Sequence, residues 1–388
     1  MSEYQYYEFR AIDRPLDRAA QAALRKISSR GEISAHRFVN SYQWGDFRGD
    51  PRRLMADWFD LFVHWTNWGT RSLMLRVPRR YLDPTAVKPY VVKGVLEAWT
   101  VNDNTIIAFD RSPEEDLDPF LEDEAEIAQS MIALRDSILR GDLRLLYLGW
   151  LIAVLDGHVD DGRPEPPCPA GLGTLSGPLK ALADFFMLDQ DLVAAAAEGS
   201  TDDMPDQVEP STAELSAFIE TLPDRDKTVF LRRAVLEGDS HVRIDIVRRW
   251  AQAADGLTTV ATPADRPQRR ARDLLAGAQA QAQRRAQREA AMEAQRQEKA
   301  RRALAKRLDA LALRVEAAWQ DVEAHIGTKQ PEAYDQAVAL LQDLRQLADR
   351  DGDRVAFDRH LKDLLNRHLG KTSFQNRLHE AGLKGKRT

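Results

Sequence analysis

The first 110 residues alternate between strand-like and helical patterns of apolar positions. Apolar and aromatic side chains at every second position predict strands within residues 4–12, 32–43 and 71–78. Two further apolar runs, "VLEAWTV" and "TIIAFD", flank the turn sequence "NDN" and predict a hairpin. A helix is expected to begin after Pro15, because proline suits the first helical turn. This order predicts an α+β fold that opens with a sandwich domain over residues 1–110, in which two helices cover one face of an antiparallel or mixed sheet.

The second helix of this domain is predicted inside residues 42–69, which hold four of the eight tryptophans. Asp50 is a suitable N-cap, Pro51 is a suitable first helical residue, and the helical pattern continues to Asn67. The rings that recur at helical spacing are expected to pack against the sheet: Trp58, Phe62 and Trp65. The two tryptophans in the flanking turns are the candidates for a surface role: Trp44 and Trp68.

The polar face of the same predicted helix carries the best catalytic constellation of the chain. Asp57, Asp60 and His64 fall on one stripe, together with Arg53. Carboxylates and an imidazole are ligands of divalent metals, so these three residues are candidates for a metal site. The alternative is a solvated face with an ion pair between Arg53 and Asp57. Because no second ligand cluster completes the coordination shell, the sequence predicts no cofactor.

An acidic linker is predicted between the first domain and a helical domain. Residues 110–126 hold nine acidic side chains against one arginine and two prolines. Like charges keep such a segment extended, so residues 111–126 are either a solvated linker or a segment that docks onto a basic surface of the same chain. Residues 127–258 then show helical periodicity interrupted by Gly, Pro and Asp, which predicts an irregular all-helical domain of short helices.

A long basic helix and a helical bundle are predicted for the last third of the chain. Residues 266–307 are built mainly from Ala, Gln and Arg, which are strong helix formers, and they hold thirteen basic and four acidic side chains. The apolar stripe that begins at Leu304 predicts a three-helix bundle over residues 304–370, with the first helix continuing to about Ile326. A basic tail is expected over residues 371–388.

Charge is distributed unevenly along the chain. The 388 residues carry a formal net charge of −6, but residues 265–388 carry +8 and residues 1–264 carry −14. Such an asymmetry indicates that one part has an oppositely charged partner, or that the two parts attract each other.

Cysteine usage and the start of the sequence favour a cytoplasmic location. Export signals typically consist of a basic segment followed by an apolar run, and the first residues of this sequence lack that pattern. Cys168 is the single cysteine, so no intramolecular disulfide and no cysteine-based zinc site can form. The longest apolar stretch, residues 143–155, is shorter than the roughly 20 residues of a membrane span and predicts a buried helix. We therefore expect no membrane contact.

The basic helix has two competing interpretations. Its basic side chains can neutralise phosphates, which predicts non-specific nucleic-acid binding, whereas the alternative is a solvated spacer or a protein-docking helix. Aromatic side chains for base stacking are missing from it, so any binding is expected to be insensitive to base sequence. Its alanine-rich faces predict at most a weak homodimer. The candidate phosphate or partner contacts are Arg269, Arg270, Arg284, Arg285, Arg288, Arg301 and Arg302.

Three amino-terminal and middle stretches, "YQYYEFRAIDRPL", "FVNSYQWGDFRGDP" and "LYLGWL", resemble a widespread bacterial family of uncharacterised proteins. The segment "GTKQPEAYDQAVALLQDLRQLA" resembles a carboxy-terminal helical segment of bacterial SWIM zinc-finger proteins. The zinc-binding signature of those proteins needs paired cysteines and is absent, because Cys168 is alone. The resemblance therefore implies a shared interaction module and a SWIM-type or other nucleic-acid-associated protein partner, but no metal site.

The sequence favours a non-enzymatic protein. It shows no nucleophile with a base partner, no phosphate-binding glycine loop and no paired metal motif. We therefore expect a multidomain interaction or scaffold protein within a nucleic-acid-associated assembly. The alternatives are a metal-dependent enzyme that uses Asp57, Asp60 and His64, and a non-specific nucleic-acid-binding protein that uses the basic helix.

Overall fold

The computed structural model describes residues 3–113, 124–201, 210–254 and 268–383. It has the expected α+β class and divides into two compact units, Met1–Arg284 and Arg285–Thr388. Both the predicted sandwich and the predicted helical middle belong to the first unit. Most of the predicted acidic linker, residues 114–123, and the end of the predicted tail, residues 384–388, lie outside the described residues.

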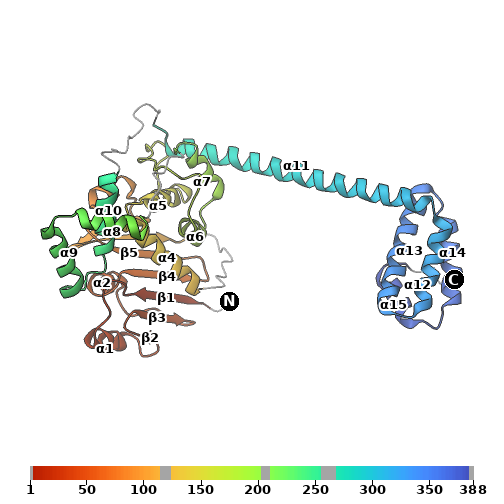
Figure 1. Cartoon of the computed structure of the whole chain (residues 1–388), viewed down its shortest axis with the longest axis horizontal. Coiled ribbons are helices and arrows are strands. Elements are labelled where there is room, and N and C mark those ends of the chain that lie inside the picture. The colour runs from red at the N-terminus through yellow and green to blue at the C-terminus, as the bar shows by residue number, and fades with distance from the viewer. Residues whose placement is uncertain (1–2, 114–123, 202–209, 255–267, 384–388) are drawn as a thin grey trace. The chain divides into compact units, whose positions relative to one another are not determined.

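A seven-stranded antiparallel sheet with the order β2-β3-β1-β4-β5-β7-β6 forms the centre of the first unit (Figure 1). β1 pairs with a neighbour on each side, so that Tyr7 stands opposite Asn40 of β3 and His64 of β4. The predicted hairpin is confirmed, and its turn contains Asn102 in the left-handed region at φ 51°. The strands are β1 Gln5–Arg10, β2 Glu32–Ile33, β3 Arg37–Tyr42, β4 Leu61–Thr66, β5 Arg71–Pro78, β6 Leu96–Val101 and β7 Asn104–Arg111.

The predicted helix over residues 51–67 is wrong beyond its first two turns. Helix α2 (Pro51–Asp57) begins as expected, with the Asp50 side chain accepting hydrogen bonds from two backbone N–H groups, but the chain then enters strand β4. In β4, Leu61 and Val63 point into one core and Phe62 points into the other. A strand buried on both faces has no polar alternation, and the spacing of its large side chains also fits one face of a helix.

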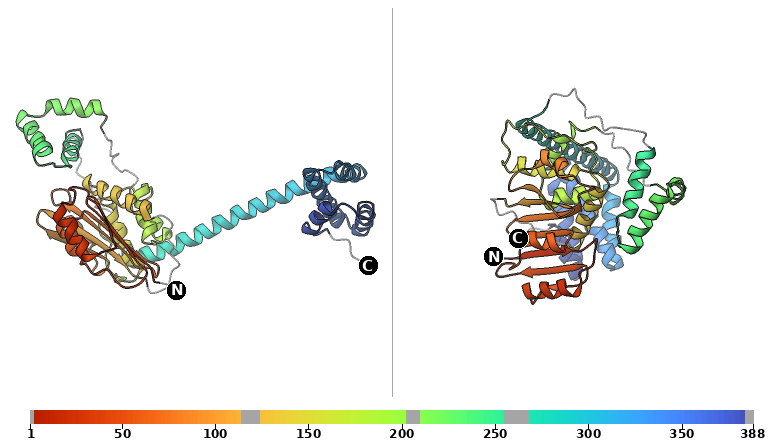
Figure 2. Two further views of the ribbon diagram at one scale, coloured as in Figure 1. Left: turned by 90° about the horizontal axis from the view of Figure 1, so that it is seen from below. Right: turned by 90° about the vertical axis from the view of Figure 1, so that its left-hand side faces the viewer.

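Helices cover both faces of the sheet, whereas the sequence predicted one covered face (Figure 2). α1 and α2 pack on the face that carries Phe9 and Phe62. α4 and α5 pack on the opposite face, and α6 and α7 pack on α4 and α5. Short α3 (Pro84–Val87) and the 3-10 turn at Lys88–Tyr90 precede β6. The remaining bounds are α1 Arg18–Ile27, α4 Glu124–Leu139, α5 Arg144–Leu155, α6 Gly177–Phe185 and α7 Gln190–Ala197.

α5 approaches the sheet closely, because it carries a glycine at the contact. Every residue from Arg144 to Val154 is buried, as expected for this apolar stretch. A methyl group added at Gly149 would lie 2.5 Å from a ring carbon of Phe109 on β7 and 3.1 Å from Leu96 on β6. Glycine at this position therefore sets the distance between helix and sheet.

Three further helices form a small lobe of the first unit: α8 Thr212–Thr221, α9 Asp224–Leu236 and α10 Val242–Ala254. α8 begins with the capping box of Ser211 and Glu214. Phe230 of α9 is the single apolar side chain of the lobe that is fully buried within its described residues. The lobe consequently has almost no core of its own, and its attachment to the rest of the unit needs other contacts.

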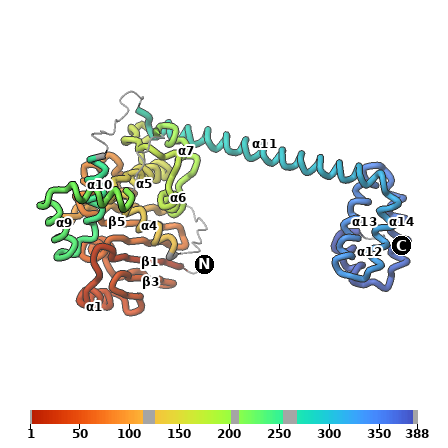
Figure 3. The backbone as a smooth tube through the Cα atoms, viewed as in Figure 1, coloured from red at the N-terminus to blue at the C-terminus, as the bar shows by residue number. Residues whose placement is uncertain are grey.

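The second unit contains the end of the long helix α11 (Ala271–Ala312) and a bundle that follows it (Figure 3). The predicted continuation to Ile326 is wrong, because the backbone leaves the helical region at Arg314, with φ −139°. The predicted basic tail is wrong over residues 372–380, which form a helix that buries Phe374 and Leu378 in the bundle. The bundle helices are α12 Val315–Thr328, α13 Pro331–Asp351, α14 Arg354–Arg367 and α15 Thr372–Glu380.

Among the described residues, none of the helices has both the length and the apolar character needed to cross a membrane.

Replacing Gly149 with alanine is expected to destabilise the first unit. Alanine adds about 1 kcal/mol of helix propensity, but overpacking against Phe109 typically costs about 1–3 kcal/mol. We expect a net loss of about 1 kcal/mol in urea unfolding followed by tryptophan fluorescence. Gly177→Ala, at the start of α6 with no atom within 4 Å, is the control and is expected to be neutral or slightly stabilising. Equal stability of the two variants would contradict the close approach of α5.

Candidate functional site

The three residues that the sequence placed on one helix face lie on different elements. Asp57 ends α2, where it is exposed and 3.6 Å from Arg53. Asp60 directly precedes β4, and His64 lies within β4. Within the described ranges, no group of three His, Cys, Asp or Glu side chains is arranged to hold a metal ion. The predicted helical stripe therefore does not exist as a metal-binding constellation.

Asp60 is a fully buried carboxylate whose oxygens are occupied by internal donors. One oxygen accepts hydrogen bonds from the backbone N–H groups of Ile12 and Asp13, at 2.7 and 2.9 Å. The other accepts from Nη2 and Nε of Arg76, at 2.9 and 3.1 Å, and lies 3.8 Å from the guanidinium of Arg135 on α4. These contacts leave Asp60 a structural role, because a metal would have to displace them.

His64 is a neutral packing residue. Its ring stacks on Tyr7 with 4.2 Å between ring centroids. Burial, with a smaller contribution from the charge of Arg71, lowers the pKa of His64 to about 4. An imidazole with this pKa stays uncharged at neutral pH and contributes aromatic surface to the sheet.

The two candidate surface tryptophans are exposed. Trp44 precedes α2 and exposes 80% of its surface, and Trp68 lies in the β4–β5 turn and exposes 36%. Trp65, by contrast, is buried with the sheet core. Among the described residues, neither Trp44 nor Trp68 stacks on another ring or on a guanidinium group, so both are isolated surface rings.

Arg269, a predicted phosphate contact, is instead an internal clamp. Its guanidinium donates two hydrogen bonds of 2.7 Å to the buried carboxylate of Glu165 and further bonds to the carbonyls of Ala195 and Ala196. The Glu165 carboxylate also accepts a hydrogen bond from the Tyr147 hydroxyl. The prediction for Arg269 is therefore wrong, because its guanidinium is bound to the carboxylate of Glu165 and is not available to a phosphate.

Cys168 lies in the same neighbourhood and is half-buried. Burial, reinforced by the nearby carboxylate of Glu165, raises the pKa of the Cys168 thiol to about 11. The thiol is therefore protonated at neutral pH and is a poor nucleophile, as a loop thiol without activation should be.

The lobe of α8 to α10 is attached to the sheet by a cluster of charged and polar groups, which we call the clasp. Tyr81 donates a 2.5 Å hydrogen bond to Asp245 of α10, and Arg80 forms a 3.1 Å ion pair with Asp239. His241 lies between two carboxylates, 3.1 Å from Asp239 and 3.2 Å from Asp13. The clasp thus supplies the attachment that the lobe's own apolar core does not.

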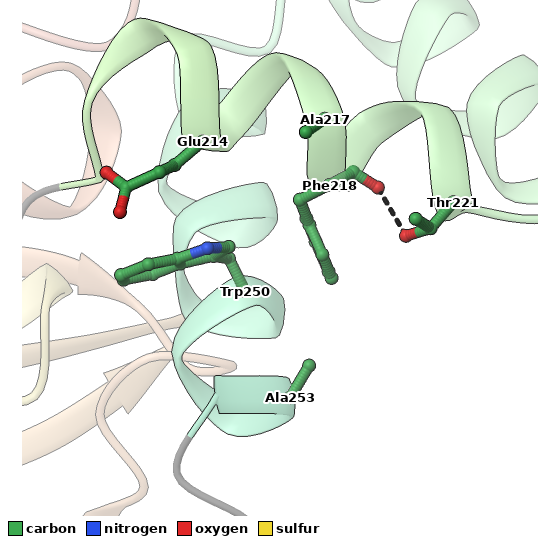
Figure 4. A pocket seen from close by; sticks show the side chains of 6 residues that line it. All are labelled: Glu214, Ala217, Phe218, Thr221, Trp250 and Ala253. Atoms are coloured by element: carbon green, nitrogen blue, oxygen red, sulfur yellow. Dashed lines mark hydrogen bonds between the residues drawn. The ribbon is translucent and has the colours of Figure 1, made fainter.

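The lobe also has an open apolar groove between α8 and α10 (Figure 4). Its volume is about 370 Å³, and it is lined by the rings of Phe218 from α8 and Trp250 from α10. Glu214 stands at one end, where its carboxylate is occupied by Ser211. Glu214 and Thr221 already hydrogen-bond to neighbouring residues, and the Trp250 indole offers a single N–H donor. One donor is too little to orient a small molecule, so the groove does not resemble a substrate site.

A basic surface lies on the part of α11 that belongs to the second unit. At about 100° per residue, seven of the eight basic side chains of residues 285–307 fall within a sector of about 140°. All seven are exposed, and we call them the basic stripe. Ala286, Ala290 and Ala294 lie on the opposite side of the helix. The stripe consists of Arg285, Arg288, Arg296, Lys299, Arg302, Lys306 and Arg307.

The members of the stripe differ in their pairing. Arg288, Lys299 and Lys306 have no ion-pair partner in the part of the chain that the structure describes. Arg296 and Arg302 pair with glutamates three or four residues away, and Arg307 pairs with an aspartate of α13. Exposed pairs of this kind contribute roughly 0.3–0.5 kcal/mol, so they give way readily to a stronger anion.

The other predicted contacts lie outside the stripe. Arg270 is exposed at the start of α11, where its backbone N–H donates to Asp273. Arg284 forms an exposed 3.1 Å pair with Glu198 within the first unit. Arg301 pairs with Glu298 and points to another side of the helix than the stripe. Of the seven predicted arginines, the stripe contains three: Arg285, Arg288 and Arg302.

Sequence reasoning missed the clasp and four members of the stripe, which are Arg296, Lys299, Lys306 and Arg307. All four could have been found by placing every basic residue of the helix on a helical wheel. The clasp joins residues about 160 positions apart, such as Tyr81 and Asp245, and no local pattern indicates it. Comparisons of the chain with protein-family models, with curated proteins and with solved structures gave no match.

Acid is expected to weaken the clasp through Asp13. Burial alone raises the pKa of Asp13, but the contact with His241 and the charge of Arg135 outweigh it and lower the pKa to about 2. A lowered pKa in the folded state gives stability that is present above the unfolded value of about 3.9 and is lost as the pH falls to about 2.

This contribution is about 2 kcal/mol at neutral pH. Asp13→Asn should therefore reduce the free energy of unfolding at pH 7 and flatten its dependence on pH between about 4 and 2. Urea unfolding at a series of pH values measures both effects. Asp103→Asn, which removes an exposed carboxylate of the β6–β7 turn without an ion-pair partner among the described residues, is the control. An unchanged pH profile in the Asp13 variant would contradict the assigned role.

Proposed function

We propose that this chain is a non-enzymatic interaction protein, and that its basic stripe binds the phosphate backbone of nucleic acid without reading base sequence. The observation that carries the proposal is the gathering of seven exposed cations on one side of α11. Guanidinium groups pair with phosphate oxygens through two hydrogen bonds, and lysines add point charge.

The dimensions of the stripe suit a polyanion. From Arg285 to Arg307 the helix rises by roughly 33 Å, at about 1.5 Å per residue. Duplex DNA carries one charge per roughly 1.7 Å of its axis, so several phosphates lie within reach of the stripe. Three cations without an internal partner, Arg288, Lys299 and Lys306, require no exchange of ion pairs on binding.

The chemistry of the helix supports backbone contact rather than base recognition. Residues 285–307 contain no aromatic side chain for stacking and no asparagine that could read an adenine edge. Of their three glutamines, Gln287 and Gln297 lie on the alanine side of the helix, and Gln295 alone lies within the sector of the stripe. A single glutamine can contact at most one base pair, which is too little to read a sequence. Binding through the stripe should consequently depend on salt and not on sequence.

The alternative of a metal-dependent enzyme has little support, because the carboxylate of Asp60 already accepts hydrogen bonds from Arg76 and from backbone N–H groups. The SWIM-type partner suggested by residues 327–348 stays a prediction. In the structure, this segment lies in α12 and α13, where Tyr334, Leu341 and Leu344 are buried in the bundle. Most of its apolar residues thus build the bundle core, and its exposed polar residues would have to provide any partner contact.

Removing the three unpaired cations of the stripe tests the proposal. The variant Arg288→Gln, Lys299→Gln, Lys306→Gln keeps helix propensity and should bind random-sequence duplex DNA more weakly than the wild type. Each lost phosphate contact reduces the slope of log K against log salt by about 0.9, so the slope should fall by about 2 to 3. Fluorescence anisotropy at several salt concentrations measures it in the full chain.

The matched control removes three exposed cations elsewhere in the second unit: Arg301→Gln, Arg359→Gln and Lys362→Gln. Its net charge equals that of the stripe variant, and its salt slope should stay within about one of the wild type. Equal effects of the two triple variants would show that net charge alone drives binding. Absence of binding by the wild type at low salt would overturn the proposal.

A further inference from the structure

α9 exposes more aliphatic surface than a solvated helix needs. Four of its thirteen residues are large aliphatic side chains with exposed fractions between 47% and 72%. Its opposite side carries Phe230, which is buried beneath the guanidinium groups of Arg233 and Arg249. The orientation of α9 is therefore fixed by its inner side, and the aliphatic residues are held outward. They are Val229, Leu231, Val235 and Leu236.

Two arginines divide this aliphatic surface. At about 100° per residue, Arg225 and Arg232 fall between the pair Leu231 and Val235 on one side and the pair Val229 and Leu236 on the other. Both arginines are exposed, and neither has an ion-pair partner among the residues that the structure describes. We call these six residues the α9 face.

The α9 face is held in place by the clasp. Arg233, which lies on the inner side of α9, pairs with Asp239 at 2.7 Å and with Asp245 at 2.5 Å. The same two carboxylates bind Arg80 and Tyr81 of the sheet region. The face is thus presented by a fixed scaffold, which lowers the conformational entropy that binding would cost.

We propose that the α9 face is a docking surface for an amphipathic helix of a partner protein whose apolar ridge is flanked by carboxylates. An aliphatic ridge at i, i+3, i+4 and i+7 spacing fits an exposed aliphatic helix face. Two unpaired arginines within that face favour Glu or Asp on the partner and disfavour Lys or Arg. The inference does not depend on the basic stripe, because it involves other residues and another class of partner.

Charge complementarity distinguishes this occupant from the others. A second copy of the chain would bring Arg225 and Arg232 against their own counterparts in a symmetric contact, which like charges oppose. A nucleic acid would use the arginines but would leave the four aliphatic side chains in water. Only a partner with both aliphatic and acidic side chains satisfies both halves of the face.

Synthetic helical peptides are the probe for this face. Two peptides share one leucine ridge at i, i+3, i+4 and i+7 spacing and differ only in having Glu or Lys at the flanking positions. The full chain should bind the Glu peptide about tenfold more tightly than the Lys peptide, because two exposed ion pairs replace two repulsions. The double variant Arg225→Glu, Arg232→Glu should invert this preference. Isothermal titration calorimetry gives the affinities.

A second variant tests the aliphatic half. Leu231→Gln with Val235→Gln should weaken the Glu peptide about tenfold or more and leave the thermal unfolding temperature unchanged, since both side chains are exposed. The control is Met292→Gln with Val355→Gln, which removes two exposed apolar side chains from the second unit. Equal binding of the Glu and Lys peptides would overturn the proposal. Self-association that the α9 variants abolish in sedimentation velocity would also overturn it in favour of a second copy.

Discussion

One buried carboxylate connects the parts of the first unit on which the α9 face depends. Asp60 binds the backbone N–H groups of Ile12 and Asp13, just after β1, and the guanidinium of Arg76 on β5. Arg135 links this group to Asp13, and Asp13 in turn faces His241 at the start of α10. Breaking a buried ion pair by removing one partner costs about 3–5 kcal/mol. Removing a charge from this chain of contacts should therefore weaken the attachment of the lobe to the sheet. The same contacts that withdraw Asp60 from metal chemistry therefore fix the orientation of a surface helix.

Local signals in the sequence predicted most helices, because the free backbone groups at a helix end often bind side chains or turns that are close in the sequence. Ser211 forms its capping box within one turn, and Gly352 ends α13 in the left-handed region. The sequence of β4 also fits a helix, because both faces of this strand are buried and it carries no alternation of polar and apolar residues. The second covered face of the sheet was missed for a related reason. α4 and α5 follow the acidic segment, and only tertiary packing shows that they return to the sheet.

The candidate surfaces differ in how far the sequence could indicate them. The basic character of α11 is visible in composition, and the stripe follows once the helix is placed. Arg269 has the same local context but folds against Glu165, and a partner 104 positions away is invisible to local reasoning. For the α9 face, local reasoning fails in the opposite direction. Leu231 and Val235 have the spacing of core residues of an amphipathic helix, but the structure exposes both. Burial depends on which neighbours exist, and the lobe has too few to cover them.

The alanine side of α11 determines where the backbone hydrogen bonds of the second unit open most easily. Between Arg285 and Leu304 the helix buries no large apolar side chain, so its backbone hydrogen bonds are supported by propensity and by weak glutamate pairs alone. Local fraying there costs little free energy and leaves the cores on either side in sequence intact. Amide hydrogens of this stretch should exchange with solvent long before those of α5 or α13. It is also where a protease that cleaves after arginine or lysine would first separate the two units while each stays folded.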